Sequence, residues 1–105
     1  MKVSLRATYG IMAAVDLAMH LGTAPVQAKS IARRQAIPAR FLEQVLHGMK
    51  KAGLVSSLRG AQGGYVLSKK PSEVSVVEIL EALDGPLSLP NGGAGRAQGR
   101  RLSKP

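Results

Sequence analysis

Residues 27–53 read QAKSIARRQAIPARFLEQVLHGMKKAG, and this stretch decides the fold. A short helix is expected over residues 27–35, with Ile31 and Ala32 facing inward. Residues 36–37 form a turn, and a longer helix follows over about 38–52. Pro38 suits the first position of that helix, because proline lacks the N–H that would be unpaired there. Two helices joined by a tight turn predict a helix-turn-helix.

The longer helix is amphipathic. Its apolar side chains recur at spacings of one, four, five and eight residues and form a stripe for the core: Phe41, Leu42, Val45, Leu46 and Met49. Its other side carries polar side chains at spacings of three, four and seven: Arg40, Glu43, Gln44, His47 and Lys51. One side is therefore expected to pack inward and the other to meet solvent or a partner.

A glycine-rich hairpin is expected after the longer helix. Residues 54–58 and 65–68 have the pattern of two short strands, and the loop 59–64 between them reads RGAQGG. Helix-turn-helix followed by such a hairpin predicts a winged helix-turn-helix, a mainly α fold with a small β-hairpin.

Two further helices complete the expected domain. The first covers Ser4–Leu21, with Ser4 as its N-cap and Gly22 as its stop. It is apolar almost all round, and a second subunit is the expected cover for its outer side. The last helix covers 76–84, because Ser75 and Glu78 have the spacing of a capping box.

The charge balance points to a polyanionic partner, either nucleic acid or an anionic membrane surface. The 105 residues have a net charge of +9 and a pI of about 10.7. Residues 86–105 carry four of these positive charges and no acid, which leaves +5 on residues 1–85. We expect 1–85 to be the DNA-binding domain and 86–105, rich in Pro, Gly and Arg, to be a disordered tail.

Several function classes are excluded or disfavoured by residue content. The chain has no cysteine, so cysteine-ligated iron–sulfur or zinc centres are not expected. His20 and His47 have no third ligand for a metal, and the serines with these histidines assemble no nucleophile–base set, so no enzyme is expected. The N-terminus has neither a secretory leader nor a membrane span, which makes a cytoplasmic location the default.

The polar side of the 38–52 helix has the chemistry to read bases in the major groove. Arg40 can donate to guanine or to a phosphate, Glu43 can accept from the cytosine amino group, and Gln44 can pair with adenine. An acid near the backbone would repel phosphates, which favours a base-reading role for Glu43. A merely solvated polar face is the alternative for these residues and for His47.

The loop 59–64 is expected to project toward a minor groove, where an arginine meets an enhanced negative potential. Arg59, Gly60 and Gln62 are its candidate DNA contacts; the alternative is a turn arginine in water, with glycines present only for positive φ. Phosphate contacts are expected from the remaining basic side chains: Arg33, Arg34, Lys50, Lys51, Lys69 and Lys70. Each of these could singly be an ordinary surface charge.

Four motifs resemble the IscR-like family of bacterial regulators: SLRATYG at 4–10, FLEQVL at 41–46, KAGLVSS at 51–57 and RGAQGGY at 59–65. The resemblance covers about residues 1–85. It implies a homodimer on a pseudo-palindromic operator, with Arg40, Glu43 and Gln44 on the recognition helix and Arg59 at the minor groove. Pro38 and Tyr9 also match positions near the DNA.

This chain departs from the family pattern in two ways. Many members carry three cysteines after the last helix, and this chain has none, so cluster binding is not carried over. Members also continue into a long dimerisation helix where this chain has its Gly/Arg-rich tail. We expect a sequence-specific DNA-binding repressor or activator with an unknown effector; the alternatives are a protein-interaction module and a non-specific nucleic-acid binder.

Overall fold

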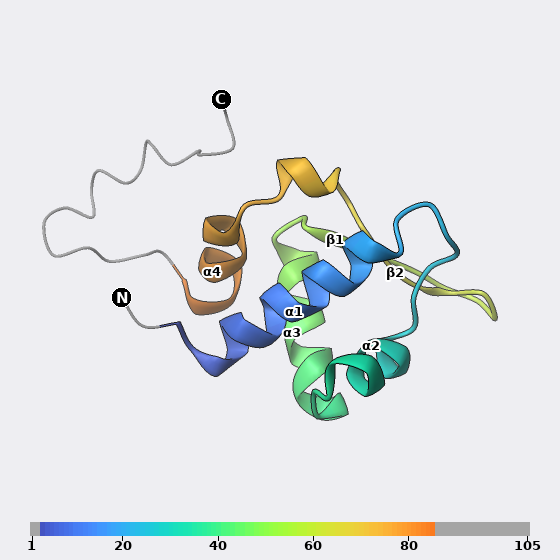
Figure 1. Cartoon of the computed structure of the whole chain (residues 1–105), viewed down its shortest axis with the longest axis horizontal. Helices are drawn as coiled ribbons and strands as arrows, with labels where there is room; N and C mark the ends of the chain where they lie inside the picture. The colour runs from blue at the N-terminus through green and yellow to red at the C-terminus, as the bar shows by residue number, and fades with distance from the viewer. Residues whose placement is uncertain (1–2, 86–105) are drawn as a thin grey trace, which may run out of the picture.

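The computed structural model describes residues 3–85, so the expected tail at 86–105 lies outside the described residues. Figure 1 shows α1 crossing α3, with α2 and α4 toward the two ends of α1 and the hairpin projecting from the helices. The elements in chain order are α1 (Leu5–Met19), α2 (Ala28–Gln35), α3 (Ala39–Lys51), β1 (Val55–Leu58), β2 (Gly64–Leu67), the 3-10 turn η1 (Pro71–Glu73) and α4 (Val76–Asp84). The predicted winged helix-turn-helix is confirmed.

The start of α1 is joined to the end of α4. Ser4 is the N-cap of α1, as expected, and its hydroxyl accepts a hydrogen bond of 3.0 Å from the Ala7 N–H. The same hydroxyl donates to the carboxylate of Asp84 at 2.8 Å. At the other end, α1 stops at Met19 rather than at Leu21.

The two helices of the helix-turn-helix end in the same way. The Ile37 N–H donates to the Ala32 carbonyl at 3.0 Å after α2, and the Leu54 N–H donates to the Met49 carbonyl at 2.9 Å after α3. These six-to-one bonds are those of a Schellman motif, which needs a left-handed residue just before the donor. Ala36 has this conformation after α2 (φ 56°, ψ 45°), and Gly53 has positive φ after α3.

The first position of α3 differs from the expectation. Pro38 is the N-cap, with φ −57° and ψ 129°, and Ala39 is the first helical residue. The proline still lies where a missing N–H costs nothing, but its extended ψ excludes it from the helix. The Pro38 carbonyl accepts the first helical hydrogen bond, from the Leu42 N–H at 2.9 Å.

The hairpin is antiparallel, with Val55 opposite Leu67 and Leu58 opposite Gly64. β1 begins one residue later than expected, because Leu54 still closes the end of α3. β2 begins at Gly64 and ends at Leu67, one residue earlier than expected at each end. Val26 forms an isolated bridge with Tyr65, with N–H to carbonyl distances of 3.0 and 2.7 Å. A Cβ on Gly64 would lie 2.6 Å from the Val26 carbonyl oxygen, so glycine permits this third pairing.

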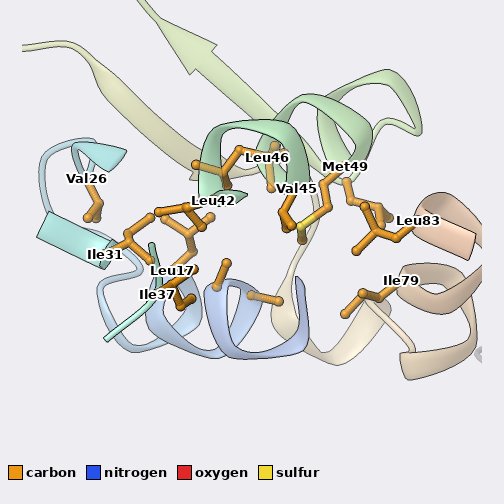
Figure 2. Close-up of a cluster of buried hydrophobic side chains, with 14 residues drawn as sticks. Leu17, Val26, Ile31, Ile37, Leu42, Val45, Leu46, Met49, Ile79 and Leu83 are labelled. Carbon is orange, nitrogen blue, oxygen red and sulfur yellow. The ribbon is translucent and has the colours of Figure 1, made fainter. Parts of the chain in front are cut away.

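The core lies where α3 meets α1 and α4. Figure 2 shows the apolar side chains of α3 pointing toward α1, with residues from α2, its following turn and α4 at the sides. The fully buried side chains of α3 are Leu42, Val45, Leu46 and Met49. Phe41, which was expected in the same stripe, is only half-buried.

Helix α4 is positioned by its cap and by one leucine. The predicted capping box is present, because the Ser75 hydroxyl accepts from the Glu78 N–H and the Glu78 carboxylate accepts from the Ser75 N–H. Leu83 then packs over two glycines: a Cβ on Gly48 would lie 2.9 Å from Leu83 Cδ2, and one on Gly10 would clash with Leu83 Cδ1.

The outer side of α1 is left open within one chain. Ala13 and Leu17 are buried in the core, whereas Val15 is 50% and Met19 is 74% exposed. Leu5 is exposed as well. Within residues 3–85, no helix has the length and apolar character needed to cross a membrane.

Candidate nucleic-acid interface

The polar side of α3 faces solvent. Its five polar residues are all exposed, and they lie opposite the four buried apolar residues of the same helix: Arg40, Glu43, Gln44, His47 and Lys51. Since 3.6 residues make one turn, this division follows directly from the spacing of the two sets. The expected amphipathic helix is confirmed, and its polar groups are available to a partner.

Tyr9 lies against the beginning of α3. Its ring meets the Phe41 ring edge to face, with centroids 5.1 Å apart and planes at 88°. Tyr9 comes from α1 and is half-buried. The structure thus brings Tyr9 next to the first turn of α3, where Arg40 and Pro38 are exposed.

The C-terminal half of α3 borders a hollow of about 470 Å³. We call it the α3–α4 hollow, and its lining residues come from α1, α3 with its C-cap, and α4: Arg6, Gln44, His47, Gly48, Lys51, Ala52, Ala82 and Leu83. Three of them, Arg6, His47 and Lys51, are basic, and none is acidic. Arg6 was not among the residues expected at the interface.

The wing lies near the beginning of α2. A second hollow, of about 320 Å³, is bounded by the wing residues 61–63, the C-cap of α1, the loop before α2, and residues of α2 with its N-cap. Gln62 and Arg34, both expected at the interface, line it together with Gln27 and Ser30. The fold therefore brings the wing and the helix-turn-helix into one surface.

The wing tip depends on close backbone contacts that only glycine permits. The Gly63 N–H donates to the Gly60 carbonyl at 2.9 Å, and a Cβ on Gly63 would lie 2.9 Å from the Arg59 carbonyl carbon. Gly60 has φ of 103°, which favours glycine. Arg59, Gly60 and Gln62 are exposed on this tight turn.

Arg34 is held by a buried carboxylate. Its Nε and Nη2 donate to the two carboxylate oxygens of Asp16 at 3.0 and 2.8 Å, and Asp16 is only 1% exposed. The Gln35 amide donates to the same carboxylate at 2.9 Å. The Arg34 hydrogen bonds hold the pKa of the Asp16 carboxyl below its ordinary value of 3.8, although burial acts in the opposite direction.

This arrangement gives Arg34 a structural role. A guanidinium bound side-on to a carboxylate fixes the end of α2 against α1, and its charge is largely neutralised. His20 adds to the cluster, with Nδ1 2.8 Å from the Asp16 backbone carbonyl oxygen and 3.5 Å from its Oδ1. Arg34 was expected to contact phosphate; its bonds in the structure are those of a residue that orients α2.

Lys69 is also paired, with its Nζ 2.8 Å from Glu78 Oε2. In the described part of the chain, no other lysine or arginine has an acid within ion-pair distance. The cations that remain unpaired there are Arg6, Lys29, Arg33, Arg40, Lys50, Lys51, Arg59 and Lys70. Most of the expected contacts thus keep their full charge for a partner.

Two important residues were missed from the sequence. Neither Asp16 nor Arg6 was among the candidate site residues. A lone acid among apolar residues, followed by an Arg-Arg pair on the next helix, could have indicated the buried ion pair. No signal in the sequence places Arg6 beside α3, because that depends on how α1 and α4 pack. Over residues 3–85, no three or more Asp, Glu or His side chains are grouped as a metal site would need.

Comparison with known proteins identifies the fold and its relatives. The Rrf2 family model, described as "Iron-dependent Transcriptional regulator", matches residues 3–102. The HTH-type transcriptional regulator CymR of Bacillus subtilis is 40% identical over 88 residues, which are 84% of this chain and 64% of CymR. IscR of Photorhabdus laumondii is 39% identical over 100 residues, 95% of this chain and 58% of that protein. The chain therefore spans less than two thirds of the length of these two relatives.

Solved structures that resemble this chain belong to the same two kinds of regulator, IscR and CymR. T. potens IscR superposes with a TM-score of 0.76 at 47% identity, covering 85% of this chain and 65% of that one. CymR of B. subtilis, whose structure is described as that of a global cysteine regulator, has a TM-score of 0.79 at 33% identity, covering 98% of this chain and 84% of that one. The resemblance to IscR-like regulators is confirmed. The relatives are named transcriptional regulators, which also confirms the expectation of a non-enzymatic protein.

Proposed function

Because this chain belongs to the Rrf2 family of transcriptional regulators, we propose that it binds DNA sequence-specifically, with the polar side of α3 in the major groove and the wing at an adjacent minor groove. The observation that carries the proposal is the division of α3. Four side chains of its apolar side are fully buried, while its exposed side combines Arg40, Glu43 and Gln44, the residue types that pair with base edges. The regulator represses or activates from the cytoplasm, where chromosomal DNA lies.

The roles divide by charge and position. Glu43 and Gln44 read bases, Arg40 reads a guanine or a phosphate, and Arg59 enters the minor groove from the wing. Pro38, Tyr9, Gly60 and Gln62 shape the surface that meets the DNA. Arg33, Lys50 and Lys51 neutralise phosphates, and they set the affinity and its salt dependence rather than the choice of sequence.

We also propose that two copies bind one pseudo-palindromic operator. The exposed apolar side chains on the outer side of α1, above all Val15 and Met19, provide a surface that a second copy would cover. Residues 1–105 contain no cysteine, so we propose no iron–sulfur cluster held by thiolates of these residues.

Selection of bound sites from random DNA by the purified chain tests the proposal. We expect a two-fold symmetric consensus. Glu43→Ala should lower the preference for this site over random DNA by about 1–3 kcal/mol, whereas Lys50→Ala should weaken both about equally. Recovery of DNA without a consensus would indicate a non-specific binder, and failure to retain DNA would indicate a protein-interaction module.

A further inference from the structure

The α3–α4 hollow contains a basic group that comes from outside the helix-turn-helix. Arg6 lies in the first turn of α1, yet it lines the same hollow as His47 and Lys51 of α3. The packing of Leu83 over Gly10 and Gly48 brings this about, because it draws the end of α4 and the beginning of α1 against α3.

The hollow is suited to an anion. Its lining contains Arg6, His47 and Lys51 and no carboxylate, and neither Arg6 nor Lys51 has an acid within ion-pair distance among residues 3–85. Arg6 Nη1 is 3.5 Å from the Leu83 carbonyl oxygen. This contact orients the guanidinium and covers one carbonyl of the last α4 turn, while the other N–H groups of Arg6 stay available.

The position of the hollow identifies the source of the anion. A helix with its side chains is about 10–12 Å across and the major groove is about 12 Å wide, so the DNA backbones run along both sides of a docked helix. The hollow lies along α3 and shares Gln44 and His47 with the proposed DNA-reading side. A phosphate at one edge of the groove would thus lie over the hollow.

We propose that Arg6, with Lys51 and His47, binds a phosphate of the DNA backbone at the edge of the major groove occupied by α3. The proposal rests on the DNA binding inferred above and adds to it a contact from α1. Arg6 fixes the position of α3 along the groove and contributes to affinity without reading a base.

Salt titrations of the full chain with its selected operator and with random DNA test this contact. Neutralising one phosphate contact changes the slope of log K against log salt by about one. We expect Arg6→Gln to reduce that slope by about one for each bound copy, and so by about two for two copies on the operator, and to weaken both DNAs equally, by about five- to ten-fold per copy at 0.1 M salt. Arg6→Lys keeps the charge and should restore the slope.

Each outcome separates the possible roles. If Arg6 only stabilises the α1–α4 contact, Arg6→Gln lowers the melting temperature without changing the slope, which overturns the proposal while site preference remains. If the wild-type chain shows no preferred site, the proposed function itself fails, and the Arg6 contact that rests on it fails too. Inorganic phosphate at constant ionic strength provides the last arm: Arg6-dependent competition between phosphate and DNA supports a shared site, whereas phosphate that binds through Arg6 without competing with DNA would overturn the assignment to the DNA backbone.

Discussion

At the scale of single residues, the Asp16–Arg34 pair shows how two adjacent arginines acquire different roles. Arg33 and Arg34 follow one another on α2, but only Arg34 reaches the carboxylate of Asp16. The Arg34 side chain stays 42% exposed, whereas the carboxylate is buried. The cost of burying the Asp16 charge is therefore offset mainly by its interaction with Arg34.

We predict that Arg34→Gln lowers the free energy of unfolding and the melting temperature clearly more than a surface substitution does, because it leaves a buried carboxylate without its main partner. Arg33→Gln is the matched control: it removes the same group one residue earlier, from an exposed side chain that has no ion pair within residues 3–85, and should change stability by no more than about 0.5 kcal/mol. Urea denaturation of both variants measures the difference. Equal effects would show that the ion pair does not stabilise the fold.

The effect of Arg34→Gln should also depend on pH. The folded pKa of Asp16 is depressed, so its ionised form contributes stability that is present above the unfolded pKa and is lost as pH falls through the folded value. The stability difference between wild type and Arg34→Gln should be complete near pH 6–7 and shrink as pH falls through about 4 and below. A difference that stays constant from pH 7 to pH 3 would contradict a role for the ionised carboxylate.

At the scale of elements, the turn between α2 and α3 is built with an unfavourable residue. Ala36 adopts the left-handed conformation that Gly53 adopts in the equivalent place after α3. A non-glycine residue in this conformation lowers the stability of the fold by about 1–2 kcal/mol. Glycine avoids this strain but raises the entropy of the unfolded chain, which lowers stability by a smaller amount. The helix-turn-helix therefore keeps some strain at its centre.

Ala36→Gly should accordingly raise the free energy of unfolding by about 0.5–1 kcal/mol, and Gly53→Ala should lower it by a similar amount. Thermal or chemical denaturation gives both values. The opposite signs at two equivalent positions are the diagnostic result. If Ala36→Gly were destabilising, the left-handed conformation of Ala36 would not be the source of strain.

The position of α4 depends on Leu83 and the two glycines beneath it. Leu83→Ala should cost about 2–5 kcal/mol through the cavity it leaves, and Gly10→Ala should cost about 1–3 kcal/mol because the new methyl group meets Leu83. In the double variant the clash with Leu83 is removed, so Gly10→Ala should cost less, with the tight contact to Ile79 Cγ2 at 3.1 Å remaining. A double-mutant cycle measures this coupling, and strictly additive costs would contradict the packing described.

At the scale of the whole molecule, the proposed dimer sets a geometric requirement on the operator. Two recognition helices related by a two-fold axis reach successive major grooves about 34 Å apart, or about 10 base pairs. Insertion of five base pairs between the half-sites should turn one half-site to the opposite face of the duplex and abolish binding of two linked copies. Gel-shift titration with the spaced operators measures this.

The surface that joins the two copies can be tested separately. The double variant Val15→Gln, Met19→Gln should shift the protein toward the monomer in sedimentation velocity, because it places amides on the exposed apolar side of α1. Binding to an isolated half-site should be unaffected. An unchanged dimer would show that another surface joins the copies.

The sequence by itself determined the elements and their inner and outer sides. The spacing of Leu42, Val45, Leu46 and Met49 required a helix with one buried side, and the Ser75–Glu78 spacing required a cap, because both depend on residues within a few turns of each other. The wing was predictable for the same reason, because the glycines that indicate its turn lie between the two strands at 59–64. Boundaries were less accurate, as at Pro38 and the strand ends, because neighbouring hydrogen bonds decide them.

The tertiary structure alone decided which charges are available to a partner. Asp16 neutralises Arg34 but not the adjacent Arg33, and Glu78 neutralises Lys69. Arg6 lines the same hollow as His47 and Lys51, although about forty residues separate them in the chain. Local patterns carry no record of these pairings. They arise only when α1, α3 and α4 pack together, since electrostatic interactions depend on distance in space rather than along the sequence.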